Sequence, residues 1–284
     1  MIYLGVDTLC WHLRLERAAV TLEDVLEQAA GLGSDFVQVN LHHVRDREVA
    51  DLRGLAGRAD ELGLRLLASG DFLGEGRNGD SPDLGINRIH AWLERAVALE
   101  SPILRVVSGF YRAELLGQPE LIEAERRYVV SVLRGALPAS DAGGIALLLE
   151  NHSDFTVDEY RSLVTEAGGS TGVFLDLINP IAALDDPVPV VRALAPLARA
   201  GHVKDYVFES IPTDDGYHRR GFAVRYRYPG EGVADLPLLV SALQEGLEGR
   251  DFHLSVEGLD NYADVSDQRE RLAPALSLLR SLVA

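Results

Sequence analysis

The sequence contains little of several features that would place a protein in a specialised class. Cys10 is the only cysteine in 284 residues, which excludes an intrachain disulfide and gives no sign of an oxidising compartment. No stretch of about 18 apolar residues could span a bilayer, and the N-terminus lacks the basic start and long apolar core of a signal peptide. Basic residues are also few, with 27 Lys and Arg against 44 Asp and Glu and a formal net charge of -17. We therefore expect a cytoplasmic protein that binds neither membranes nor nucleic acid, because a phosphate backbone would be repelled.

What the sequence does contain is a regular alternation of short apolar runs and longer amphipathic segments. The alternation repeats eight times without a low-complexity linker. The expected strands span residues 2–8, 35–41, 64–70, 103–109, 145–151, 172–178, 200–207 and 251–258, and the helix candidates between them include 22–33, 86–100 and 188–200. Such an order indicates parallel strands joined by right-handed helical crossovers. It predicts an α/β fold, a (β/α)₈ TIM barrel in which residues 1–284 form a single domain. A doubly wound open sheet is the rival, weakened because no Gly-rich phosphate turn follows the first strand.

Polar residues stand at the ends of the last four expected strands. Glu150, Asp176 and Glu257 end strands five, six and eight, and His202 lies in strand seven. Since barrel enzymes build their sites at the carboxyl ends of the strands, these four side chains are expected to meet at one point. A mostly hard-oxygen set of this kind suits one divalent ion, Mn²⁺ first, with Mg²⁺, Co²⁺ or Zn²⁺ as alternatives. The cation would compensate three carboxylates that otherwise repel one another.

Other charged residues fall near this expected site. Lys204 shares a strand face with His202, so it either orients a substrate oxygen or pairs with a carboxylate. Arg105 lies inside an apolar strand, which predicts an internal salt bridge. The segment 206–232 is long for a strand-helix connection and indicates an active-site cover or a subunit contact. Its basic residues are His218, Arg219, Arg220, Arg225 and Arg227.

Several short motifs resemble those of a known family. LLLENH (147–152), GVFLDLINP (172–180), GHVKD (201–205), PGEG (229–232) and SVEG (255–258) are similar to motifs of the xylose-isomerase-like sugar phosphate isomerases and epimerases. That TIM-barrel superfamily also contains endonuclease IV. The resemblance covers nearly the whole chain. It implies that Glu150, Asp176, His202 and Glu257 bind the metal and that the two glutamates form an acid/base pair.

The resemblance implies a metal-dependent isomerase or epimerase that acts on a sugar or cyclitol through an enediolate. In that chemistry one glutamate removes the proton next to a polarised carbonyl and the other returns one. The alternative is a metal-dependent lyase or dehydratase acting on a keto-sugar, a 3-keto-glycoside or a C-glycoside. A non-catalytic partner subunit is a third reading. In the segment 206–232 the acidic residues nearly offset the charge of the basic ones, which favours an unphosphorylated sugar over a phosphorylated one. The chain could also form a homo-oligomer.

The remaining site candidates are less specific. Asn179 stands where several members of the family have a histidine. It can hydrogen-bond a substrate hydroxyl but cannot shuttle a proton, which weakens the match to the ketose 3-epimerases and counts against endonuclease IV. His152 is expected to be a further catalytic proton carrier or a loop histidine. Trp11 and His12 either wall the sugar or pack against the barrel, and together with Asn179, Lys204 and Arg227 they complete the expected substrate-binding set. His42 and His43 close strand two, where at most one of them faces the barrel mouth.

Overall fold

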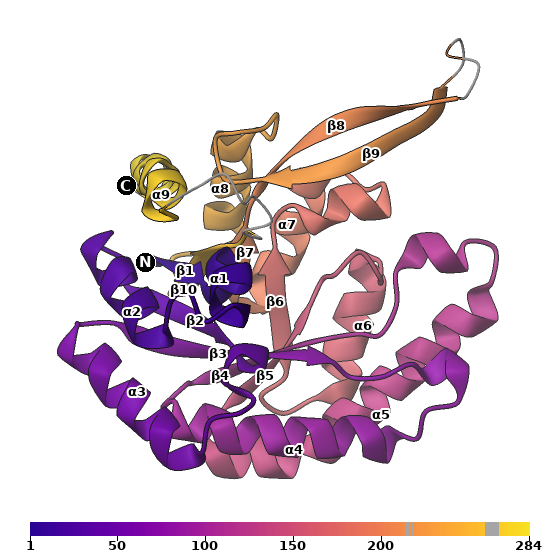
Figure 1. Ribbon diagram of the computed structural model, residues 1–284. Coiled ribbons are helices and arrows are strands. Elements are labelled where there is room, and N and C mark those ends of the chain that lie inside the picture. The colour runs from indigo at the N-terminus through magenta and orange to yellow at the C-terminus, as the bar shows by residue number, and fades with distance from the viewer. Residues whose placement is uncertain (214–215, 217–218, 259–266) are drawn as a thin grey trace.

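The computed structural model describes residues 1–213, 216, 219–258 and 267–284. Eight parallel strands close into a barrel in the order β1-β10-β7-β6-β5-β4-β3-β2 (Figure 1). These strands are β1 (Ile2–Asp7), β2 (Phe36–Asn40), β3 (Arg65–Phe72), β4 (Ile103–Val107), β5 (Ala146–Glu150), β6 (Gly172–Asp176), β7 (Ala198–Val203) and β10 (Phe252–Val256). Each overlaps one of the eight expected segments, so the predicted TIM barrel is confirmed and the open sheet is excluded.

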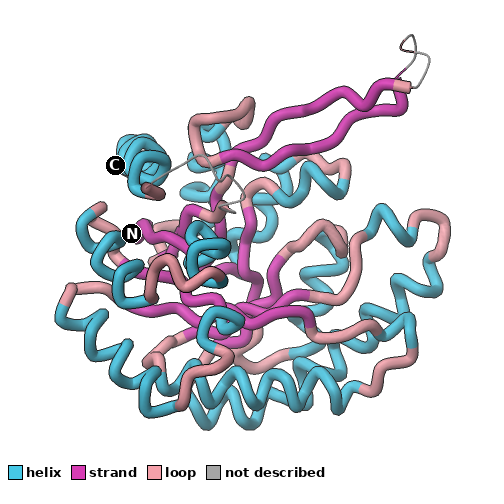
Figure 2. Tube along the Cα trace, in the orientation of Figure 1, coloured by secondary structure: helices cyan, strands magenta, loops and turns pink. Residues whose placement is uncertain are grey.

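Helices surround the barrel strands, and the two strands of a separate hairpin project beyond them (Figure 2). The α-helices are α1 (His12–Glu16), α2 (Leu22–Gly31), α3 (Val49–Glu61), α4 (Pro82–Ala98), α5 (Pro119–Gly143), α6 (Val157–Ala167), α7 (Pro187–Leu194), α8 (Leu236–Leu247) and α9 (Arg269–Val283). Short 3-10 helices are η1 (Thr8–Trp11), η2 (Leu41–Val44), η3 (Gly76–Asn78), η4 (Arg112–Leu115), η5 (Asn179–Ala183) and η6 (Ala195–Leu197). Within the described residues, no helix combines the length and the apolar character needed to cross a membrane.

Burial on both faces explains why the barrel strands read as continuous apolar runs. Every residue of β5 is buried, including its terminal Glu150. Phe36, Leu67, Leu148 and Phe174 belong to a separate buried cluster, and the ring of Phe174 lies 4.6 Å from that of His202. The apolar filling of the barrel therefore ends directly beneath the polar residues.

A long antiparallel hairpin interrupts the last strand-helix-strand unit, and the sequence pattern did not predict it. The expected strand 200–207 ends at Val203, and the chain continues as β8 (Asp205–Pro212), which pairs with β9 (Arg219–Arg227). This hairpin projects away from the barrel (Figure 1). The expected helix 188–200 also stops early, at Leu194, and the chain continues as the short η6 (Ala195–Leu197), because Pro196 has no backbone N–H with which to extend the α-helical hydrogen bonds.

Two of the short motifs meet at the base of this hairpin. The Asp205 carboxylate accepts hydrogen bonds from the backbone N–H groups of Gly230 (3.1 Å), Gly232 (3.0 Å) and Ala234 (2.9 Å). A Cβ atom at Gly232 would collide with the Asp205 carboxylate and the Tyr206 carbonyl. The last residue of GHVKD and the glycines of PGEG thus anchor the hairpin at the carboxyl end of the barrel.

Candidate active site

The four predicted metal ligands come together at the carboxyl ends of β5, β6, β7 and β10. Ligand atoms of Glu150, Asp176 and His202 all lie within 4.8 Å of one another. His202 Nδ1 is 3.3 Å from Glu257 Oε1, 3.9 Å from Asp176 Oδ2 and 4.0 Å from Glu150 Oε1. The imidazole and the carboxylates of Glu150 and Asp176 are completely buried. Strand register explains the meeting, because Asp176 pairs with His202 across β6 and β7.

Glu150 and Asp176 are each held by several donors. Glu150 forms an ion pair with Arg105 through Oε2 and accepts a hydrogen bond from Asn179 Nδ2 at 3.0 Å through Oε1. Asp176 Oδ1 accepts the backbone N–H groups of Ile178 and Asn179, both at 2.7 Å. The internal salt bridge predicted for Arg105 is therefore confirmed, and Asn179 is placed against a ligand carboxylate.

Lys204, the only lysine of the chain, lies between two of the acids. Its Nζ is 2.6 Å from Asp176 Oδ2 and also forms an ion pair with Glu257. The ammonium group lies 4.7 Å from the ring centroid of Tyr226, a cation–π distance. Of the two roles expected for Lys204, pairing with a carboxylate is therefore observed. The same residue borders the cavity described below.

His202 is oriented from behind by residues that were not predicted. Its Nε2 lies 3.2 Å from Asp7 Oδ2 and 2.7 Å from the side-chain amide of Gln38. Asp7 Oδ2 can accept a proton carried by Nε2, whereas the amide nitrogen of Gln38 is a donor that needs a bare Nε2, so the two neighbours favour opposite tautomers of the ring. The tautomer with its proton on Nε2 is the one that leaves the Nδ1 lone pair available to a metal. Nδ1 is buried and has no hydrogen-bond partner among the described residues.

Burial and neighbouring charges shift the pKa values in this centre. Burial raises the pKa of Asp176 above its ordinary value despite the nearby Lys204. Burial also acts to raise the pKa of Glu257, but Lys204 and His202 outweigh it and bring the pKa well below the usual range. Burial also acts to raise the pKa of Glu150, but the charge of Arg105 outweighs it, so that the pKa lies below its ordinary value. Glu150 and Glu257 are therefore ionised at neutral pH.

The charges at the centre leave room for a divalent cation. Within the described residues, the carboxylates of Asp7, Glu150, Asp176 and Glu257 surround His202, and two cations, Arg105 and Lys204, face them. In the form that binds a metal, with ionised carboxylates and a neutral imidazole, four negative charges against two positive ones give a formal charge of about -2 in a buried site, which needs compensation. An ion held by Glu150, Asp176, His202 Nδ1 and Glu257 would supply it and would give the unpartnered nitrogen a ligand role. The residues present therefore fit a divalent metal.

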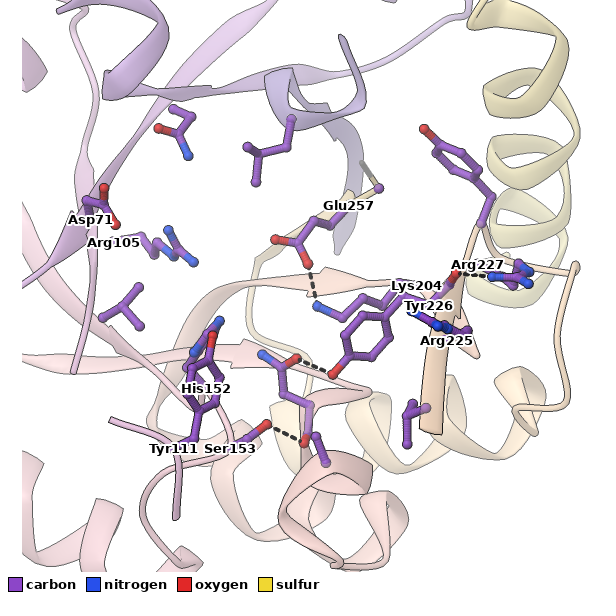
Figure 3. Close-up of a pocket in the computed structure, with 18 of the residues that line it drawn as sticks. Asp71, Arg105, Tyr111, His152, Ser153, Lys204, Arg225, Tyr226, Arg227 and Glu257 are labelled. Atoms are coloured by element: carbon purple, nitrogen blue, oxygen red, sulfur yellow. Dashed lines mark hydrogen bonds and ion pairs between the residues drawn. The ribbon is translucent and has the colours of Figure 1, made fainter. Parts of the chain in front are cut away.

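A cavity of about 510 Å³ opens above this centre. Arg105, Asn179, Lys204 and Glu257 line it on the barrel side, and the hairpin contributes a wall that includes Tyr226 and Arg227. Figure 3 shows Glu257 and Lys204 pointing toward each other, with Arg105 and Asp71 on the far side of the opening. Glu150 lies deeper and is not among the lining residues.

The other predicted residues have different surroundings. His152 lines the cavity, and its ring contacts those of Phe72 (5.7 Å) and Tyr111 (5.3 Å). Trp11 is completely buried and donates from Nε1 to Gln28 Oε1 at 3.0 Å, which fits the packing alternative rather than a sugar wall.

Two further predictions fall on loops around the barrel mouth, at His12 and in the segment 206–232. His12 does not line the cavity and instead contacts His43. The segment 206–232 supplies a cavity wall, in line with an active-site cover, whereas His218 lies outside the described residues.

Sequence reasoning missed three residues that shape the site. Asp7 ends the first strand as the other acids end theirs, so the same rule could have found it. Gln38 is a polar residue within an apolar strand, which is a weaker signal. Tyr226 gave no signal, because its position depends on a hairpin that periodicity did not reveal.

Comparisons with known proteins agree with this architecture. A family model described as xylose isomerase-like TIM barrel matches residues 26–282. A D-psicose 3-epimerase solved in the presence of D-fructose is 18% identical, with a TM-score of 0.75 and 99% of both chains covered. The IOLI protein with a binding zinc atom is 18% identical, with a TM-score of 0.72 and coverage of 99% of this chain and 98% of that one. A probable 3-DHS dehydratase from Bacillus anthracis is 16% identical, with a TM-score of 0.71 and 99% of both chains covered.

At these identities the similar structures show the fold alone. A comparison with curated protein sequences gives no match. The family model, however, spans far more than half of the sequence and covers all four residues of the acidic centre. The chain therefore belongs to the xylose isomerase-like TIM barrel family.

Proposed function

We propose that the protein is a divalent-metal-dependent isomerase or epimerase acting on an unphosphorylated sugar or cyclitol, with Mn²⁺ as the preferred ion. The observation that carries this proposal is a buried centre of about -2 formal charge in its metal-binding form, beneath a cavity with a polar floor. The imidazole Nδ1 of this centre has no hydrogen-bond partner in the part of the chain that the structure describes. Hard oxygen ligands with one nitrogen favour Mn²⁺ or Mg²⁺ over ions that prefer soft ligands. A D-psicose 3-epimerase and a zinc-binding protein among the similar structures support the proposal.

The two glutamates have different positions, which suggests different tasks. Glu257 borders the cavity and is ionised, so it can take the proton from the carbon next to a substrate carbonyl. Glu150 lies deeper, where Arg105 and Asn179 fix its carboxylate, and it is the second group that can exchange a proton. A divalent ion bound between them would polarise the carbonyl and hydroxyl oxygens and stabilise the charge of the enediolate. Lys204 holds Glu257 in place and offers an N–H donor at the cavity floor.

A lyase or dehydratase is the second candidate, and His152 is the observation that favours it. Its ring lines the cavity, and its Nδ1 atom is buried without a hydrogen-bond partner among the described residues. Elimination needs a group that protonates the departing oxygen, and an imidazole can do this near neutral pH. A probable dehydratase is among the similar structures. A keto-sugar, 3-keto-glycoside or C-glycoside would be the substrate in that case.

Hydrogen exchange in heavy water distinguishes these functions. The protein is stripped of metal, reconstituted with Mn²⁺ and incubated with ketoses and 3-keto-glycosides. We expect deuterium at the carbon next to the carbonyl, and loss of water or of an aglycone would instead identify the lyase. No exchange, together with no bound metal, would contradict both and leave the reading of a non-catalytic partner subunit.

Single substitutions test the roles of the named residues. Glu257→Gln and Glu150→Gln should abolish exchange while the barrel stays folded, and His202→Ala should mainly lower metal affinity. Arg192→Ala, which removes an exposed ion pair with Glu245, is the matched control and should leave exchange unchanged. Full activity of Glu257→Gln would refute the two-glutamate assignment. The cytoplasmic location and the lack of nucleic-acid and membrane partners stay predictions from the sequence.

A further inference from the structure

A second group of metal-ligating side chains lies outside the acidic centre, on the loops that follow β1 and β2. His12 begins α1, Glu16 ends it, and His43 lies in η2. Their ligand atoms all lie within 4.8 Å of one another. His12 and Glu16 are four residues apart, so they share one face of the helix. The group has no residue in common with the centre formed by Glu150, Asp176, His202 and Glu257.

The two imidazoles face each other with their ring nitrogens. His12 Nδ1 is 2.9 Å from His43 Nε2, a distance at which two ring nitrogens can share only one proton. At Zn–N bond lengths of 2.0–2.1 Å in a tetrahedral site, two nitrogen ligands stand about 3.3 Å apart. An ion could therefore take the place of the shared proton after a movement of a few tenths of an ångström.

His43 is fixed by the kind of contact that orients metal-binding histidines. Its other ring nitrogen, Nδ1, is 2.9 Å from the hydroxyl of Thr8. Thr8 is completely buried, and its hydroxyl accepts the backbone N–H of Asn40 at 2.9 Å. A hydrogen bond to the second nitrogen selects the tautomer and ring orientation of a ligating histidine.

The carboxylate of Glu16 supplies the third ligand. Arg45 binds it with Nη1 at 2.9 Å and Nη2 at 3.3 Å, which leaves further lone pairs on both oxygens. His42 Nε2 lies 3.2 Å from Glu16 Oε1 and adds another nitrogen at the edge of the group. Since Glu16 and Arg45 are partly exposed, their side chains can adjust to an incoming ion.

From this arrangement we infer a second metal site, formed by His12, Glu16 and His43, that takes a transition-metal ion such as Zn²⁺. Two imidazoles and one carboxylate suit Zn²⁺, Co²⁺ or Ni²⁺ better than Mn²⁺ or Mg²⁺. Three protein ligands leave a fourth position for water. The ion would tie the loop after β1 to the loop after β2 beside the barrel mouth. This site goes beyond the proposed function and does not depend on it.

Metal stoichiometry tests the inference without reference to turnover. Tag-free protein is stripped with EDTA, titrated with Zn²⁺ in a calorimeter and assayed for bound metal after dialysis. We expect two Zn²⁺ ions per wild-type chain and one per chain of His12→Ala or His43→Ala. The Glu257→Gln/His202→Ala double variant should also bind one, at the loop site. His90→Ala, an exposed histidine of α4, is the control and should still bind two.

If a histidine variant folds poorly, further measurements can still test the loop metal site. Glu16→Gln, a change at an exposed residue, should weaken the loop site at least tenfold and leave the central site unchanged. Wild-type protein that binds no Zn²⁺, or that binds one ion which both His12→Ala and His43→Ala retain, would overturn the inference. Two ions retained by both His12→Ala and His43→Ala would overturn it as well.

Discussion

Replacing Lys204 by methionine tests the charge balance on which the proposed metal site depends. Lys204 is 5% exposed and pairs with both Asp176 and Glu257. Its removal leaves those two carboxylates buried without their partner, and breaking a buried ion pair from one side costs about 3–5 kcal/mol. We expect a loss of this size in the free energy of unfolding of metal-free Lys204→Met. An exposed pair is worth only about 0–1 kcal/mol, so Arg192→Met, which breaks the pair with Glu245, serves as the control.

Mn²⁺ should restore part of the stability that Lys204→Met loses. An ion present at about 100 times its dissociation constant stabilises a folded protein by about 2.7 kcal/mol. The variant has one positive charge fewer beside the ligands, so it should bind Mn²⁺ more tightly and gain more than the wild type at the same concentration. Urea unfolding of both proteins, in EDTA and in Mn²⁺, measures this difference.

Three results would refute this reasoning. If Mn²⁺ stabilised neither protein, no divalent ion would bind at this centre, and the charge argument would fail. If Mn²⁺ stabilised the wild type more than the variant, Lys204 would assist metal binding instead of opposing it. A loss in Lys204→Met no larger than in Arg192→Met would show that the pair with Asp176 and Glu257 is solvated.

Three further predictions concern the surroundings of the same centre. Asp7→Asn removes the carboxylate 3.2 Å from His202 Nε2 and should lower Mn²⁺ affinity about 10–100-fold, measured by calorimetry; an unchanged affinity would exclude Asp7 as the residue that orients His202. Burial raises the pKa of the Tyr226 hydroxyl to about 12, compared with about 10 for tyrosine in an unfolded chain. The stability that the neutral hydroxyl contributes is therefore present below pH 10 and is lost as the pH rises toward 12. Tyr226→Phe should therefore lose less free energy of unfolding than the wild type across that interval, and equal losses would contradict the shift. Finally, reductive methylation followed by peptide mapping should modify the exposed N-terminal amine but spare Lys204, whereas Glu257→Gln should make Lys204 reactive; a reactive lysine in the wild type would show that the ion pairs are open.

Patterns of short range were enough to predict the barrel and the central acids. A parallel barrel strand is buried on both faces, so a segment such as ALLLE must be apolar up to the residue that reaches the mouth, and Glu150 stands out there. The same reasoning placed Asp176, His202 and Glu257, since the ends of neighbouring parallel strands meet on one side of a closed sheet. Arg105 was predicted to need an anionic partner because a buried cation cannot remain unpaired.

Other features depended on contacts between residues far apart in the chain. The hairpin of β8 and β9 was not predicted, because the register between its strands is fixed by pairing rather than by a period within either one. Tyr226 reaches the cavity only through that pairing. The aromatic side chain of Trp11 was expected either to wall the sugar or to pack against the barrel. The packing of α2 places Gln28 beside the indole N–H, and Trp11 is buried.

The sequence by itself determined the order of strands and helices, the closed barrel and the identity of the acids at its mouth, because burial and strand period act on neighbouring residues. Only the tertiary structure decided which charges partner which acid, that His202 Nδ1 has no hydrogen-bond partner among the described residues, and that His12 contacts His43 and not the cavity. These outcomes depend on distances between side chains from different strands and loops. Such distances are set when the barrel closes, and no local pattern in the sequence records them.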